Sequence, residues 1–305
     1  MEIRLVRPEE INQAAAVLLL GRPRCPSSME KSYGELLARL KSTGMDFSRQ
    51  IVAVKEGEVL ASCAFTQVDP TSAHVIAPAM LPSVETENIK LERGMIECAV
   101  AEARRLGAKL VQTVLEKEDW PRQTAFRDAG FEPLAELSFM ERHPQRADCA
   151  MEAPPWLRFI TYEKDREGVF LDVIRSTYEG TLDCPALSSL RTAEETLEGH
   201  KRSGKFDPLM WFLAFDKRNT PVGVLLLNLM EISDRFNVTF MGVVAEFRGR
   251  GLGMAFVKYA LRRICETHRT VLTLAVDTRN WPACRIYKEA GFVETARKEV
   301  LYRYF

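Results

Sequence analysis

Internal repetition is the feature that most constrains the fold of this 305-residue chain. The pattern Trp-Pro, seven residues and then Ala-Gly-Phe begins at Trp120 and again at Trp281, 161 positions later. A second pair, Cys25-Pro26 and Cys184-Pro185, recurs at an offset of 159. The two offsets nearly agree, and a chain of this length suits two domains of about 150 residues each. The sequence therefore predicts a duplication, with two similar domains in tandem.

Hydrophobic periodicity predicts the same order of elements in both halves. Each half begins with a strand, two helices and a pair of strands, and continues as strand, helix, strand, helix and strand. In the second half the predicted elements are strand 158–162, helices 167–178 and 193–203, strands 210–215, 222–229 and 238–244, helix 254–266, strand 271–276, helix 282–290 and strand 298–304. We therefore expect an α/β (α+β) fold of two units, each a mixed, mainly antiparallel twisted sheet flanked by helices.

The segment between the halves contains Pro144, Pro154 and Pro155. Proline-rich polar segments are typical of linkers. The predicted organisation is therefore a domain at 1–142, a linker at 143–155 and a domain at 156–305.

Charge, hydropathy and cysteine usage exclude several classes of protein. Lys plus Arg and Asp plus Glu both number 42 without a long block of like charge, so neither nucleic acid nor an anionic membrane is an expected partner. The longest apolar runs are far shorter than the roughly 20 residues that cross a bilayer, and the N-terminus lacks the pattern of a signal peptide. The seven cysteines are scattered without a Cys-x-x-Cys pair, and only four histidines occur. This usage predicts a soluble, cytoplasmic protein without a zinc site or a disulfide scaffold.

A glycine-rich loop, Arg248-Gly249-Arg250-Gly251-Leu252-Gly253, lies between a predicted strand and a predicted helix. In such a turn several backbone N–H groups converge on one anion, and the helix dipole favours negative charge there. Arg248 and Arg250 can add charge-assisted contacts. Met254 stands where a Rossmann fingerprint needs its last glycine, and the Gly-Lys-Ser/Thr of a P-loop is missing. The pattern indicates a phosphate-binding loop, with a plain strand-to-helix turn as the alternative.

Two motifs resemble those of the GNAT superfamily of acyl-CoA N-acyltransferases. The run Arg248-x-x-Gly251-x-Gly253, preceded by Met241-Gly242-Val243, resembles the superfamily's Gln/Arg-x-x-Gly-x-Gly/Ala motif. The run Asn280-x-x-Ala283-x-x-x-Tyr287-x-x-x-Gly291-Phe292 resembles the motif that follows it. The resemblance covers about 155–305 and extends to 1–142 through the repeat. It implies acetyl-CoA as the cosubstrate.

The resemblance also implies how the cosubstrate is held. The CoA pyrophosphate would bind the N–H groups of Gly249, Arg250, Gly251, Leu252, Gly253 and Met254, in a turn shaped by Arg248. Backbone groups of Met241 and Val243 would pair with the pantetheine arm between two splayed parallel strands, and Asn280 would contact the same arm. The N–H of Val243 or Val244 would stabilise the oxyanion of the tetrahedral intermediate.

For the chemistry, the resemblance points to Tyr287, whose phenol would protonate the departing thiolate. Packing of its ring on Ile286 and Phe292 is the alternative. The general base is open, because superfamily members that use a Glu carry it eleven residues before the loop motif, where this chain has Asn237. Glu231 is the first substitute for this base and Asp234 and Asp277 are the others, but for each of the three a solvated loop carboxylate is the favoured alternative. Direct attack by a neutral amine needs none of them.

Three further residues have two interpretations each. Cys184 lies between the first two helices of the second half, where the superfamily places acceptor-binding residues, but cysteine is also a common small core residue. Trp281 and Phe206 are expected to pack rather than to recognise the acceptor.

The first half departs from these motifs. At an offset of 161, the loop maps to residues 87–92, which contain no glycine and two carboxylates. Tyr287 maps to Phe126, which has no proton to donate, and Asn280 maps to Asp119. We therefore expect the first domain to be non-catalytic, either covering the acceptor cleft of the second domain or adding stability.

Together these features predict an N-acetyltransferase that moves an acetyl group from acetyl-CoA to a primary amine of a small molecule, in a direct ternary complex. The alternatives are a non-catalytic acyl-CoA sensor or binding module and a protein or peptide N-acetyltransferase. The chain is expected to be a monomer or a homodimer.

Overall fold

The chain forms two compact units that are not simply its two consecutive halves. The computed structural model describes residues 1–21, 26–42, 45–84, 89–231, 233–267 and 269–305. The first unit comprises Met1–Leu134 and Glu299–Phe305, and the second comprises Ala135–Lys298. Cys25, part of the repeated Cys-Pro pattern, lies outside the described residues.

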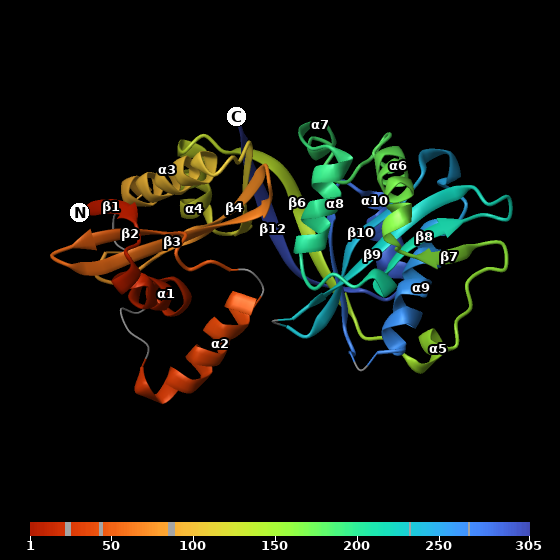
Figure 1. Cartoon of the computed structure of the whole chain (residues 1–305), viewed down its shortest axis with the longest axis horizontal. Coiled ribbons are helices and arrows are strands. Elements are labelled where there is room, and N and C mark those ends of the chain that lie inside the picture. The colour runs from red at the N-terminus through yellow and green to blue at the C-terminus, as the bar shows by residue number, and fades with distance from the viewer. Residues whose placement is uncertain (22–25, 43–44, 85–88, 232, 268) are drawn as a thin grey trace. The chain divides into compact units, whose positions relative to one another are not determined.

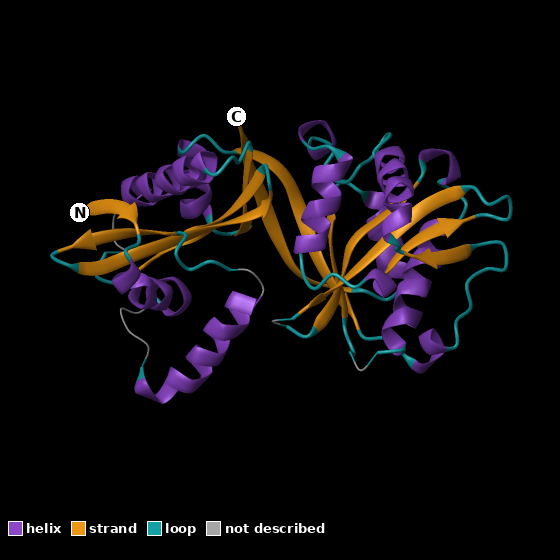
Figure 2. Ribbon diagram, viewed as in Figure 1, coloured by secondary structure: helices purple, strands orange, loops and turns teal. Residues whose placement is uncertain are grey.

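The first unit is a sheet with helices on both faces (Figure 1, Figure 2). Its elements are β1 (Glu2–Leu5), α1 (Ile11–Leu20), α2 (Glu30–Ser42), β2 (Gln50–Lys55), β3 (Glu58–Asp69), β4 (Ser72–Met80), α3 (Ile89–Arg105), β5 (Leu110–Glu116) and α4 (Trp120–Asp128). The strand order is β1-β2-β3-β4-β5 and then the end of β12 (Val293–Tyr304). The pairs from β1 to β4 are antiparallel, and β4 pairs with β5 in parallel. In β2, Ile51 and Ala53 join the core under α3 and α4, whereas Val52 and Val54 join the core under α1.

The second unit repeats this arrangement with its own helices. Its elements are β6 (Glu132–Arg142), α5 (Arg146–Cys149), β7 (Arg158–Thr161), α6 (Glu167–Thr177), α7 (Leu187–Leu190), α8 (Ala193–Arg202), β8 (Trp211–Phe215), β9 (Pro221–Met230), β10 (Arg235–Val243), α9 (Leu252–Cys265), β11 (Leu272–Asp277) and α10 (Trp281–Glu289). The strand order is β6-β11-β10-β9-β8-β7, and the start of β12 lies beside β6. In β8, Trp211 and Leu213 join the core under α6 and α8, whereas Phe212 and Ala214 join the core under α9.

The last strand of each half is completed in the unit of the other half. In the second unit, 137–142 of β6 pair with 272–277 of β11 in antiparallel register. In the first unit, Leu301 of β12 is completely buried, and the Phe305 N–H donates to the Lys109 carbonyl at 2.9 Å. The predicted boundaries at 142 and 156 therefore do not coincide with the compact units. Sequence spacing places each strand but does not identify its hydrogen-bonding neighbour.

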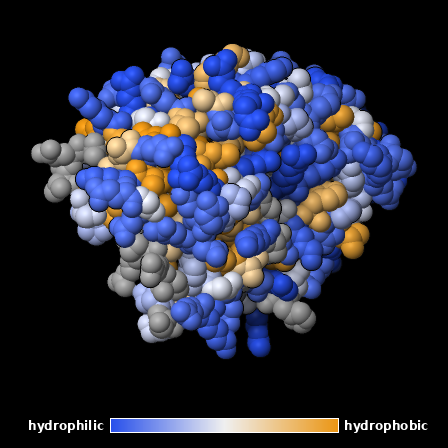
Figure 3. Space-filling model, turned by 60° about the vertical axis from the view of Figure 1, so that its left-hand side comes forward, coloured by the Kyte–Doolittle hydropathy of each residue, from blue (hydrophilic) through white to orange (hydrophobic). Residues whose placement is uncertain are grey.

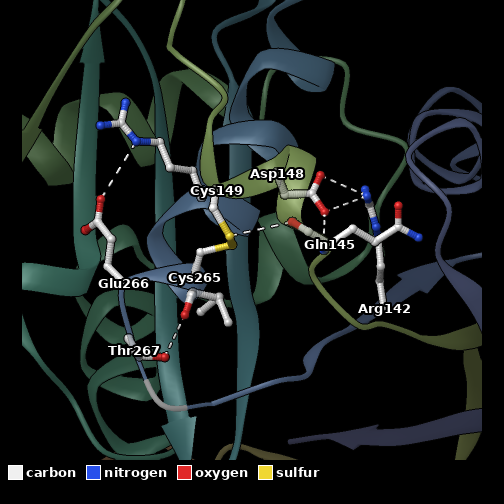
Figure 4. The surroundings of a disulfide bond; sticks show 9 residues. Arg142, Gln145, Asp148, Cys149, Cys265, Glu266 and Thr267 are labelled. Carbon is white, nitrogen blue, oxygen red and sulfur yellow. Dashed lines mark hydrogen bonds and ion pairs between the residues drawn. A yellow bond between two sulfur atoms is a disulfide. The ribbon is translucent and has the colours of Figure 1, made fainter.

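The predicted linker 143–155 contains a short helix and one half of a disulfide. Cys149 of α5 is bonded to Cys265 at the end of α9, with their Cα atoms 5.4 Å apart (Figure 4). Beside this bond, Arg142 forms an ion pair with the buried Asp148 at 2.8 Å. The prediction that the cysteines form no disulfide scaffold is wrong for this pair. The two residues are 116 positions apart, and only the fold brings them together.

None of the helices described here is both long and apolar enough to span a membrane. On the face drawn in Figure 3, hydrophilic residues predominate and hydrophobic residues form small patches between them.

Candidate active site

A cavity of about 250 Å³ lies in the second unit where two parallel strands separate. β10 and β11 pair at Phe236 with Leu272 and at Asn237 with Thr273, and in the described part of the chain the pairing ends there. A bulge between Val238 and Phe240 bends β10 at the same level. Residues of the α6 end, the loop after it, β10, β11, α9 and α10 line the cavity. The gap gives an extended ligand access to the unpaired edge of β10.

Backbone direction along β10 determines which groups face this gap. The Val244 N–H donates to the Val222 carbonyl of the β9 side at 3.0 Å. Because successive strand residues point their N–H groups to opposite sides, the N–H of Val243 faces the gap. Met241 has the same orientation as Val243. Of the two predicted oxyanion donors, Val244 is therefore already engaged and Val243 is the free one.

The loop before α9 presents unpaired backbone donors. Gly249 and Gly251 have φ of 74° and 79°, left-handed values that glycine adopts without a side-chain penalty. The first backbone hydrogen bond into α9 runs from the Ala255 N–H to the Gly251 carbonyl at 3.2 Å. Among the described residues, no intramolecular acceptor is recorded for the six N–H groups from Gly249 to Met254. Such a run at a helix N-terminus suits a pyrophosphate.

Arg248 holds this loop against the rest of the site. Its guanidinium donates to the carbonyls of Val243 at 3.1 Å, Gly180 at 3.2 Å and Thr177 at 2.8 Å. These bonds connect the loop to the end of β10 and to the end of α6. Arg250 donates to the Glu246 carbonyl at 3.0 Å and lies over the Phe247 ring. Arg248 thus fixes the loop relative to β10 and α6, while Arg250 adds positive charge beside it.

Tyr287 of α10 combines a packed ring with an accessible hydroxyl. The residue is 6% exposed and its ring lies 5.7 Å from that of Phe292. It also lines the cavity, and among the described residues no hydrogen bond of its hydroxyl is recorded. Burial raises the pKa of Tyr287 above its usual value, so the phenol stays protonated at neutral pH. The ring packing that was the alternative for Tyr287 is therefore present, and its role as proton donor stays a prediction.

Asn280 has a structural role that the motif did not reveal. It is the N-cap of α10, and its side-chain oxygen accepts the Ala283 N–H at 3.3 Å. Its counterpart Asp119 caps α4 in the same way, through the Arg122 N–H. Asn280 nevertheless lines the cavity, so capping and contact with the pantetheine arm are compatible.

The carboxylates predicted as bases lie elsewhere. Glu231 is exposed in the turn between β9 and β10 and is not part of the cavity lining. Asp234 is paired with Arg269 at 2.9 Å. Asp277 is completely buried, not solvated. Burial disfavours its charge, but hydrogen bonds from Arg279 and from the Cys184 N–H outweigh this effect and lower the pKa of Asp277.

One carboxylate that sequence reasoning missed does line the cavity. Asp183 stands in the loop after α6 and is exposed to the cavity solvent. The residue after it, Cys184, is half-buried at a φ of 44° and is not part of that lining. Asp183 precedes the repeated Cys-Pro pattern, but nothing in the spacing connected that pattern with the cavity.

The two residues expected to pack behave differently. Phe206 packs edge-to-face on Tyr162 and Trp211, as predicted. Trp281 is 67% exposed, so the packing prediction is wrong for it. It occupies the first turn of α10, where Pro282 and the Asn280 cap already define the helix start.

In the first unit, the position equivalent to the loop is partly outside the described residues, which omit 85–88. The described part, from Ile89 to Glu92, is already the start of α3, and Glu92 is buried. Phe126 is completely buried, with its ring 5.0 Å from Phe131. The aromatic packing around Tyr287 is thus reproduced in the first unit without a hydroxyl.

Comparisons with known proteins agree with this geometry. The family model described as FR47-like protein matches residues 231–301, which contain the loop and Tyr287. The mycothiol acetyltransferase of Thermobifida fusca (strain YX) is 24% identical over 273 residues, covering 84% of this chain and 82% of that protein.

Two solved structures share the fold over nearly the whole chain. A GCN5-related N-acetyltransferase from Sphaerobacter thermophilus has a TM-score of 0.63 at 18% identity, covering 99% of this chain and 95% of that one. A tandem GNAT protein from the clavulanic acid biosynthesis pathway has a TM-score of 0.56 at 13% identity, covering 99% and 98%. Residues 231–301 therefore match the FR47-like model, and the whole chain shares the fold of a tandem GNAT protein. Together with the acetyltransferase relative, these similarities support an acyl-CoA-dependent N-acyltransferase that uses acetyl-CoA.

Proposed function

We propose that the second unit transfers an acetyl group from acetyl-CoA to a primary amine of a small molecule. The observation that carries this proposal is the splayed-strand cavity, with unpaired N–H groups on its α9 side and a phenol hydroxyl on its α10 side. The loop N–H groups from Gly249 to Met254 would bind the pyrophosphate. Backbone groups of Met241 and Val243 would align the pantetheine arm.

In this proposal Val243 and Tyr287 act on the reacting centre from different elements. The Val243 N–H would stabilise negative charge on the thioester oxygen as the amine adds. Tyr287 would donate its proton to the sulfur as the carbon–sulfur bond breaks. Its raised pKa suits an acid that must remain protonated until that moment.

The small-molecule acceptor rests on the size of the cavity and on the name of one relative. A cavity of about 250 Å³ that must also hold the end of a pantetheine arm has little room for a folded protein substrate. The relative from Thermobifida fusca is named for mycothiol, a small molecule. We propose the class of the acceptor, a small primary amine.

The first unit, in the same proposal, does not turn over acetyl-CoA. Phe126 stands where Tyr287 stands in the second unit, and residues 87–92 lack the glycines of the loop. A phenyl ring cannot protonate a thiolate, so the proton donor of the reaction is missing there. We propose that this unit contributes its fold and the strand it exchanges.

The test is a thiol-release assay with acetyl-CoA against polyamines, aminoglycosides, amino acids, amino sugars and lysine-containing peptides. The proposal predicts release well above the amine-free reaction with at least one small amine, and acetylated product by mass spectrometry. Turnover confined to peptides would support a peptide N-acetyltransferase instead. Tight binding of acetyl-CoA without any turnover would support a sensor.

A further inference from the structure

Asp183 shares the cavity of the second unit with Tyr287, although the two come from different parts of the fold. It lies in the loop between α6 and α7, whereas Tyr287 lies on α10. The cavity lining also includes Thr181, Leu182 and Asn280 beside it. Asp183 is exposed to solvent, and among the described residues that line the cavity it is the one with a carboxylate side chain.

Hydrogen bonds hold this carboxylate in place. One of its oxygens accepts the Asp277 N–H at 3.0 Å, at the end of β11. The side chain of Asn280, at the start of α10, favours the charged form of this carboxylate. The backbone N–H of Asp183 donates to the Thr181 hydroxyl at 3.1 Å, which fixes the turn. A carboxylate held by a hydrogen bond from β11, in a turn fixed by Thr181, keeps its direction when a ligand enters.

The charge of Asp183 is not neutralised as that of its neighbour is. Asp277 has an ion pair with Arg279 at 2.6 Å. For Asp183, no ion pair is recorded within the ranges that the structure describes, and Asp183 reaches Arg279 only as a longer-range charge. The carboxylate of Asp183 can therefore form an ion pair with a cationic group that enters the cavity.

The surroundings favour proton uptake at this position. Protein atoms displace part of the water around Asp183, and the charge of Asp277 adds to this effect, so the pKa of Asp183 is raised from its usual value. The titratable groups that face it are Tyr178, Cys184, Asp277, Arg279, Cys284 and Tyr287. Of these, Arg279 is the cation.

We propose that Asp183 binds the ammonium group of the acceptor and removes the proton that makes this amine a nucleophile. This inference rests on the proposed function and names the base that the sequence left open. It also restricts the acceptor to amines that arrive protonated, since an anchored carboxylate attracts a cation and repels an anion.

The proton balance of the reaction follows from these positions. Asp183 takes one proton from the ammonium, and the free amine adds to the thioester carbon while the carbonyl oxygen becomes an oxyanion. The carbon–sulfur bond then breaks, and Tyr287 gives its proton to the sulfur. The nitrogen loses its second proton to the Tyr287 oxygen, through water, and Asp183 releases its proton to solvent. The products are the acetamide, CoA as a thiol, and one proton.

The test compares Asp183→Asn and Asp183→Glu with the wild type, using the best amine from the thiol-release assay. Asp165→Asn is the control, because it removes the same charge from an exposed position outside the cavity. The inference predicts that Asp183→Asn lowers kcat/KM for the amine by roughly 100-fold or more, the range of a lost general base. Asp183→Glu should restore part of the activity, and the Kd of acetyl-CoA should stay near that of the wild type.

The pH profile separates this role from a purely structural one. In the wild type, kcat/KM should fall as acid protonates Asp183, and this acid limb should be missing in Asp183→Asn. An Asp183→Asn variant that keeps the acid limb, or keeps wild-type kcat/KM, overturns the inference while leaving the proposed function intact. If the wild type acetylates no amine at all, the proposed function itself fails.

Discussion

Tyr287 and Phe126 occupy matching positions in the two halves, and their side chains differ by one oxygen atom. Tyr287 and Phe126 are both buried against a following phenylalanine, Phe292 and Phe131. The rings therefore do the same packing in both units. The hydroxyl of Tyr287 adds a proton donor at the cavity, which is why its loss should affect chemistry and leave folding unchanged.

Replacement of Tyr287 by Phe tests this separation. We expect kcat to fall by roughly 100-fold or more, as for other lost general acids, while the thermal midpoint and the Kd of acetyl-CoA stay near wild type. Tyr259→Phe is the control, since this ring stacks on Phe159 at 3.8 Å, outside the cavity. Equal turnover by wild type and Tyr287→Phe would remove the tyrosine from the mechanism.

The buried imidazole of His200 should make the stability of the protein depend on pH. Burial lowers its pKa from 6.5 to about 4, and its Nε2 has no recorded partner in the described chain. In the unfolded chain His200 therefore binds a proton below about pH 6.5, whereas in the folded chain it binds this proton only below about pH 4. As the pH is lowered through this window, the contribution of His200 to the unfolding free energy should fall by about 3 kcal/mol in total, and this contribution should stay constant at lower pH.

Urea titrations of the wild type and His200→Phe between pH 4 and pH 7.5 measure this effect. The phenyl ring preserves the contact with Phe240, whose ring lies 5.1 Å from that of His200. The difference in unfolding free energy between the two proteins should change across the window. A constant difference at every pH would show that His200 does not titrate as described.

Among the elements, the helices and strands around the site could be predicted closely, but their long-range partners could not. The start and end of α10 were predicted within one residue and those of α9 within two, because periodicity, glycines and proline act locally. The Cys149–Cys265 bond and the neighbours of β6 and β12 depend on contacts between distant residues. Asp183 was missed for the same reason, since a loop carboxylate has no spacing signal until the fold places it in a cavity.

The disulfide predicts that reduction loosens the attachment of segment 143–155 to α9. Cys149→Ser should lower the unfolding free energy of the oxidised protein by about 2 to 4 kcal/mol, the usual range for a long disulfide loop. The wild type should lose a similar amount when dithiothreitol is added, whereas the variant should not respond. A wild type that is equally stable with and without reductant would indicate that this bond adds nothing.

At the scale of the whole molecule, the exchanged strands make each unit depend on the other half of the sequence. Leu301, near the end of the chain, is completely buried in the core of the first unit. A fragment that contains only 1–142 lacks this residue and the strand around it. Division of the chain between 142 and 156 would therefore cut across both cores.

Leu301→Ala tests this dependence in the full chain. A buried leucine lost to alanine costs about 2 to 5 kcal/mol, and we expect faster hydrogen exchange in β5 and α3 of the first unit. Exchange in α9 and binding of acetyl-CoA should remain as in the wild type. Val293→Ala, at a 66% exposed position of the same strand, is the control. Faster exchange in the second unit alone would contradict the strand assignment.

We predict that one acetyl-CoA binds each chain, on the loop of the second unit, and calorimetric titration measures this stoichiometry. Gly251→Asp places a carboxylate in the phosphate-binding loop before α9, in a left-handed conformation that Asp tolerates. Gly21→Asp is the matched control, since Gly21 is also left-handed, at a φ of 60°, with open space around it. We predict one site per wild-type chain, unchanged in Gly21→Asp and lost in Gly251→Asp. Two sites per chain, or unchanged binding in Gly251→Asp, would contradict the account.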